Sequence, residues 1–79
     1  MRVIYPIHAR ERMEQRGISK EQIEQTIKCP SISLPTEHKR RKRAMGKFGT
    51  KTLVVIYEPR KNNSAVLVTA LWLKEDDRK

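Results

Sequence analysis

The sequence predicts a small α+β domain in which two helices pack on one face of an antiparallel meander sheet, in the order β-α-α-β-β-β. Residues 52–57 and 65–73 are apolar on both faces of a strand, as central strands are. Residues 7–28 carry two helical patterns separated by a glycine. A chain of 79 residues has room for one core, so we expect a single domain over residues 1–79.

The chain is expected to begin with a short strand over residues 3–5, which Pro6 ends. A first helix follows over residues 7–16. Gly17 then suits the left-handed residue that commonly follows a helix, so the first helix should stop there.

A second helix is predicted by its start signals. Ser19 as the N-cap and Gln22 three residues later form the pattern of a capping box. Ile23 and Ile27 supply an apolar stripe at helical spacing, and Pro30 should end the helix. The corner between the two helices therefore fixes how the first helix is presented.

The second half of the chain is typical of strands joined by short connections, which pair as an antiparallel meander. The expected elements are a connection (31–38), a strand (39–45), a turn (46–49), a strand (52–57), a hairpin loop (59–63), a strand (65–73) and a frayed tail (74–79). The two helices should cover one face of this sheet and leave part of the other face open.

Charge gives the second constraint. Eighteen Lys and Arg against nine Asp and Glu leave a net charge of +9, which predicts a polyanionic partner such as nucleic acid, an anionic membrane surface or an acidic protein. The charge is clustered in residues 39–43, which favours nucleic acid.

Within that cluster, Lys39, Arg41 and Arg43 would share one face of a strand, and Arg40 and Lys42 the other. The pattern does not say which set faces outward. A structural alternative explains the same cluster: charged side chains on an edge strand prevent it from pairing with another chain and aggregating.

Several classes of site are not expected. Cys29 is the single cysteine, so no internal disulfide can form and a reducing, cytoplasmic location fits. The two histidines and this cysteine show no metal-ligand spacing, and the chain is too small for a nucleotide-cofactor domain, so we expect neither metal nor cofactor. We expect no secretory signal and no membrane span, because the apolar runs are short.

The most informative pattern is His8, Arg12 and Arg16, which recur every four residues and fall within about 80° of arc on the first helix. Three such groups repel one another, and an anion between them would explain them well. Structural alternatives remain open: a local hydrogen bond for His8, a salt bridge for Arg12 and an interaction of Arg16 with the helix dipole.

Residues 8–19 and the later strands resemble a family of small domains in the RelE/ParE toxin superfamily, close to the BrnT-like proteins. The resemblance implies the toxin of a toxin–antitoxin pair, with a small antitoxin as its partner. It also implies RNA cleavage without a metal, in many members on the ribosome. The ParE branch instead acts on DNA gyrase.

On this resemblance we expect a metal-independent endoribonuclease that cleaves mRNA. His8 is the candidate for proton transfer, because imidazole titrates near neutral pH, and Arg12 and Arg16 would bind the scissile phosphate. The expected substrate-binding residues are Lys39, Arg41, Arg43 and His38. Two alternatives stay open: a basic nucleic-acid-binding module without catalysis, and a non-enzymatic toxin that binds an acidic protein target.

Overall fold

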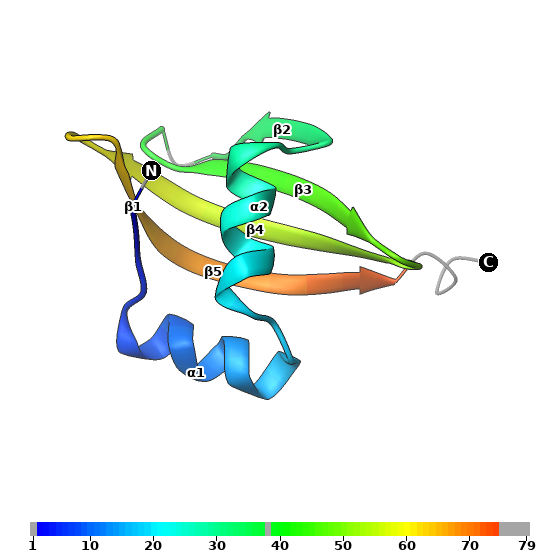
Figure 1. The fold of residues 1–79 in the computed structure, drawn as a ribbon. Helices are drawn as coiled ribbons and strands as arrows, with labels where there is room; N and C mark the ends of the chain where they lie inside the picture. Colours follow the sequence, from blue (N-terminus) through cyan, green and yellow to red (C-terminus); the bar gives the residue numbers. More distant parts are fainter. Residues whose placement is uncertain (1, 38, 75–79) are drawn as a thin grey trace.

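The computed structural model describes residues 2–37 and 39–74, which form a five-stranded sheet with two helices on one face (Figure 1). The elements in chain order are β1 (Arg2–Ile4), α1 (Ile7–Arg16), α2 (Lys20–Lys28), β2 (Ile32–Pro35), β3 (Lys42–Phe48), β4 (Lys51–Arg60) and β5 (Ser64–Lys74). The strand order is β1-β5-β4-β3-β2, and β2 to β5 form an antiparallel meander. The predicted α+β class, with helices on one face, is confirmed.

The helix α1 has the bounds that the sequence predicts. Gly17 adopts the left-handed conformation at φ 67°. Its N–H donates to the Glu14 carbonyl at 3.4 Å, and the next N–H, of Ile18, donates to the Met13 carbonyl at 2.9 Å. These bonds satisfy carbonyls that would otherwise be unpaired at the helix end.

The helix α2 begins with the predicted capping box. The Gln22 N–H donates to the Ser19 hydroxyl at 3.1 Å, and the Ser19 N–H donates to the Gln22 side-chain oxygen at 3.0 Å. A polar contact also ties this helix to the segment that precedes α1. The Tyr5 hydroxyl donates to the Glu24 carboxylate at 2.7 Å, and burial together with this bond raises the pKa of Tyr5.

Three strand predictions need correction. The expected connection over residues 31–38 contains a short strand, β2, which exists because it pairs with β3. The strand expected from residue 39 begins at Lys42, since residues 39 and 40 form a turn. The first strand, expected over residues 3–5, is β1 over Arg2–Ile4, and it pairs in parallel with β5 outside the antiparallel meander.

The expected turn over residues 46–49 is also wrong, because Gly46 lies inside β3 and the turn lies at residues 49 and 50. Gly46 is needed for packing: a Cβ there would lie 3.1 Å from the Thr26 hydroxyl oxygen of α2. Gly49 is the turn glycine, with φ 68°. Residues 59 and 60, expected in the hairpin loop, belong to β4, and the loop spans residues 61–63.

The core lies between the helices and one face of the sheet. Its largest fully buried side chains come from α2, β4 and β5, and they are Ile23, Leu53, Leu67, Val55 and Thr26. On α1, only Ala9 and Met13 are buried. Of the expected tail, Lys74 ends β5 and residues 75–79 lie outside the described residues. No helix in the described part of the chain is long and apolar enough to span a membrane.

Candidate nucleic-acid interface

The outer side of α1 presents the first candidate group. The His8 side chain is 93% exposed, and its Nδ1 lies 3.9 Å from a carboxylate oxygen of Glu11. Arg12 follows one helical turn later, about 5.4 Å along the axis, and is exposed. Its guanidinium makes no hydrogen bond or ion pair with the residues that the structure describes. Both side chains are therefore accessible to a ligand in solution.

Arg16 has a structural contact as well. Its Nη1 donates to the Ala70 carbonyl of β5 at 2.7 Å, and its own carbonyl accepts a bond from the Trp72 indole N–H at 2.8 Å. These two bonds attach the end of α1 to β5. A guanidinium has five N–H donors, so the bond to Ala70 occupies a small part of its capacity.

The basic cluster lies around the β2–β3 connection. Arg41 precedes β3, and its Nε lies 4.0 Å from a carboxylate oxygen of Glu58 on β4. The other oxygen of Glu58 lies 3.3 Å from Nε of Arg60. Glu58 is 18% exposed, and the buried Arg41 Nε has no hydrogen-bond acceptor among the described residues. One carboxylate therefore balances two guanidinium groups, and a net positive charge remains.

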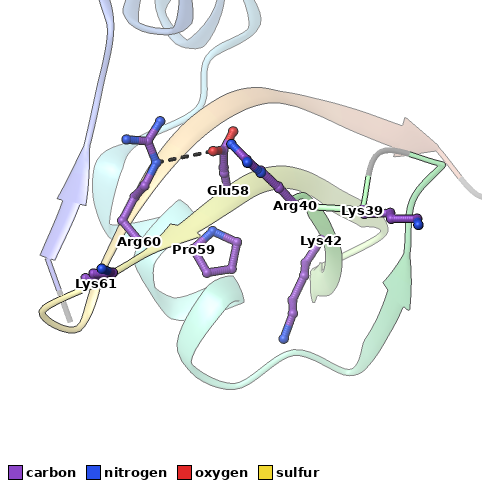
Figure 2. Close-up of a pocket in the computed structure, with 7 residues that line it drawn as sticks. All are labelled: Lys39, Arg40, Lys42, Glu58, Pro59, Arg60 and Lys61. Carbon is purple, nitrogen blue, oxygen red and sulfur yellow. Dashed lines mark ion pairs between the residues drawn. The ribbon is translucent and has the colours of Figure 1, made fainter.

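An open pocket of about 600 Å³ lies at this end of the sheet (Figure 2). It is lined by Lys39, Arg40, Lys42, Glu58, Pro59, Arg60 and Lys61. The lining thus contains five cationic side chains and one carboxylate, which is a composition suited to phosphate groups. In Figure 2, Arg60 reaches toward Glu58, while Lys42 points away from that pair.

Sequence reasoning missed Arg60 and Lys61, because it placed them in a hairpin loop without a role. The signal that could have found them is the pairing of β3 with β4. Lys42 lies opposite Tyr57, so the residues before Lys42 come close to those after Tyr57.

The strand register shows which basic residues lie on the helix-free face of the sheet. Arg43 pairs with Leu34 and Ile56 on the face of the sheet without helices. Lys42 lies on the same side of β3 as Ala44, which is fully buried under the helices. Lys39 and Arg41 line a second pocket together with Ser33, Leu34 and Lys42. His38 lies outside the described residues, so its predicted role stays a prediction.

The two candidate groups lie on different parts of the molecule. α1 packs on β5, and β4 separates β5 from β3 (Figure 1). Neither pocket around the basic cluster is lined by a residue of α1. His8, Arg12 and Arg16 therefore all lie on α1, whereas Lys39 and Arg41 precede β3 and Arg43 lies within it. Among the described residues, no group of three or more His, Cys, Asp or Glu could hold a metal ion.

The fold matches that of a solved protein. The crystal structure of the Brucella abortus ribonuclease toxin BrnT superposes with a TM-score of 0.70, covering 94% of this chain and 97% of that chain. The two sequences are 18% identical, so the likeness establishes a shared fold. None of the curated proteins matches the sequence.

A family model described as "Domain of unknown function (DUF4258)" matches residues 7–72. The match begins at the first residue of α1 and extends to Trp72 in β5. It covers both helices and most of the sheet. The chain therefore belongs to the DUF4258 family.

Proposed function

We propose that the chain is the toxin of a toxin–antitoxin pair and that it cleaves mRNA without a metal ion. The observation that carries the proposal is the fold it shares, over 94% of its length, with a protein described as a ribonuclease toxin. The net charge of +9 supports a polyanionic substrate. The segment 8–19 further supports a relation to the RelE/ParE superfamily.

In the proposed reaction the ribose 2′-hydroxyl attacks the adjacent phosphorus. The bond from the 2′-oxygen to phosphorus forms, and the bond from phosphorus to the 5′-oxygen breaks. A base accepts the 2′-hydroxyl proton, an acid protonates the departing 5′-oxygen, and cations stabilise the negative charge in between. The products carry a 2′,3′-cyclic phosphate and a 5′-hydroxyl.

The residues of α1 supply these roles in our proposal. His8 is assigned the proton transfer, because its imidazole is exposed and its Nδ1 side lies near Glu11, which leaves Nε2 for the RNA. Arg12 is assigned to the scissile phosphate, since a guanidinium matches two phosphate oxygens at once. Arg16 would contribute the N–H donors that its bond to Ala70 does not use.

The basic cluster would bind the RNA backbone away from the cleaved bond. Lys39, Arg41 and Arg43 are the substrate-binding residues predicted from sequence, with His38 beside them, and the pocket at the end of the sheet adds Arg60 and Lys61. Contacts of this kind hold phosphates and do not read bases. We infer a cytoplasmic site of action, where mRNA and ribosomes are, and a small antitoxin as the protein partner.

The proposal is tested with the purified full chain and a labelled mRNA in excess EDTA. We expect cleavage that leaves 2′,3′-cyclic phosphate ends, and growth arrest with mRNA loss when the chain is expressed in bacteria. A His8→Ala preparation, purified in the same way, controls for contaminating nucleases. The proposal is contradicted if the mRNA stays intact both alone and in the presence of ribosomes. It is also contradicted if His8→Ala cleaves the mRNA as fast as the wild type does.

A nucleic-acid-binding module without catalysis is favoured by one observation: the pocket with five cationic lining residues lies at the end of the sheet, away from α1. If each of the five cationic side chains contacts one phosphate of single-stranded RNA, the logarithm of the association constant should fall with the logarithm of the salt concentration at a slope of about −3.5. Under this alternative, His8→Ala leaves both affinity and biological effect unchanged. Loss of RNA cleavage in His8→Ala would decide against it.

A further inference from the structure

The face of the sheet opposite the helices is apolar across four strands. Residues that pair directly across strands lie on the same side of the sheet. The register places one apolar row from β2 to β5, made of Ile32, Met45, Val54 and Leu71. A second row contains Leu34, Arg43, Ile56 and Thr69.

Several aliphatic side chains of this face are open to water. Ile32 is 50% exposed, Leu34 is 40% exposed and Leu73 is 49% exposed. These groups lie on the edge strand β2 and at the end of β5, while Val54 between them is buried. Exposed apolar side chains on one face of a sheet mark a surface that binds a partner. Both helices of the described chain pack on the other side of the sheet, so neither covers this face (Figure 1).

The chemistry of the face favours a polypeptide over nucleic acid. All four aromatic side chains lie on the helix side of the sheet. Tyr57 is buried in the core, Tyr5 bonds Glu24 of α2, and Phe48 packs edge-on against Trp72 with 6.1 Å between ring centres. The open face therefore has no ring on which a base could stack. Its apolar row, with Leu34 and Ile56 beside it, matches aliphatic side chains of another polypeptide.

The charge of this face indicates that the bound polypeptide is negatively charged. On β3, Arg43 lies two residues before Met45 and Lys47 two residues after it. Both therefore point to the helix-free side of the sheet and lie next to the first row. A second copy of this chain, also at +9, would be repelled. Acidic side chains would be attracted to the same positions.

We propose that the helix-free face of the sheet docks an acidic amphipathic helix of a partner polypeptide. The four strands β2 to β5 span about 14 Å from centre to centre, which accommodates one helix of about 10 Å diameter. The inference deepens the partner part of the proposed function, and it rests on that function for the identification of the partner as the antitoxin.

The test uses the full chain labelled with ¹⁵N and a synthetic helical peptide with leucines on one face and glutamates on the other. We expect amide shift changes centred on Ile32, Met45, Val54 and Leu71. Ile32→Glu, which adds a repelling charge to an exposed position, should weaken binding about tenfold. The matched control is Ile7→Glu, because Ile7 is 64% exposed on α1, and it should change affinity less than about twofold.

Four results overturn the docking proposal. The peptide could map to α1 or to the basic pocket, or the two glutamate variants could weaken binding equally. Oligouridine could shift the row Ile32, Met45, Val54 and Leu71 and not only the surroundings of Arg43, or light scattering could show that the chain alone dimerises through this face. Peptide mapping on the wild-type chain keeps the test valid if Ile32→Glu misfolds. RNA cleavage by Ile32→Glu should equal that of the wild type. The docking site and the nuclease activity can therefore fail independently.

Discussion

The two helices cover the same side of the sheet, but the interactions that hold them differ. α2 buries Ile23, Thr26 and Ile27, and it starts at a complete capping box. α1 buries only Ala9 and Met13 and has no side-chain cap at its first residue. The end of α1 is held to β5 by two polar contacts instead.

The core of the fold therefore depends mainly on α2, while α1 contributes only two buried apolar side chains. The outer side of α1 can therefore carry His8 and Arg12, whose side chains are exposed and add no buried apolar surface. We expect stability and function to separate between the two helices.

Ile23→Ala should lower the free energy of unfolding by about 2–5 kcal/mol, because Ile23 is fully buried and the substitution leaves a cavity. Urea denaturation measures this loss. Ile7→Ala on α1 is the control, since Ile7 is 64% exposed, and it should stay within about 0.5 kcal/mol of the wild type. Similar losses for both variants would remove the contrast between the helices.

Gly46→Ala should destabilise the contact between α2 and β3 by about 1–3 kcal/mol, because the added Cβ would lie 3.1 Å from the Thr26 hydroxyl oxygen. That hydroxyl donates to the Gln22 carbonyl at 2.8 Å, so moving it away from the new Cβ would weaken this hydrogen bond. A double-mutant cycle with Thr26→Ala should recover part of the loss. Strict additivity of the two substitutions would show that the close approach is unimportant.

Trp72→Phe should cost about 1 kcal/mol, because it keeps an aromatic ring but removes the indole N–H that donates to the Arg16 carbonyl. The effect should be local. Hydrogen exchange should accelerate at the end of α1 and stay unchanged in α2. Uniform acceleration across both helices would indicate that this bond supports the whole fold.

Local signals in the sequence predicted the helices well. The capping box at Ser19 and the left-handed Gly17 depend on neighbouring residues, and both are found in the structure. Non-local features were harder to predict. Gly46 and Gly49 look alike in sequence, yet Gly49 forms a turn, while Gly46 allows the approach of Thr26, which lies twenty residues earlier in the chain.

The candidate site shows the same limit. Helical spacing correctly placed His8, Arg12 and Arg16 on one helix, because that arrangement depends on periodicity alone. The distance from α1 to Arg43 depends on the strand order, in which β4 separates β3 from β5. That order follows from long-range pairing, which a single sequence does not display. The pairing also determined that Arg43 faces the helix-free side.

In the proposed reaction the exposed side chains of His8 and Arg12 on α1, and not the overall positive charge, perform the cleavage. The direct test compares RNA cleavage rates of Arg12→Ala and Arg10→Ala in EDTA, because both remove one exposed guanidinium from the same helix. The two positions point about 160° apart around the helix. The account predicts a loss of about 100-fold for Arg12→Ala and less than about twofold for Arg10→Ala. Equal losses in the two variants, or an unchanged rate in Arg12→Ala, would contradict it.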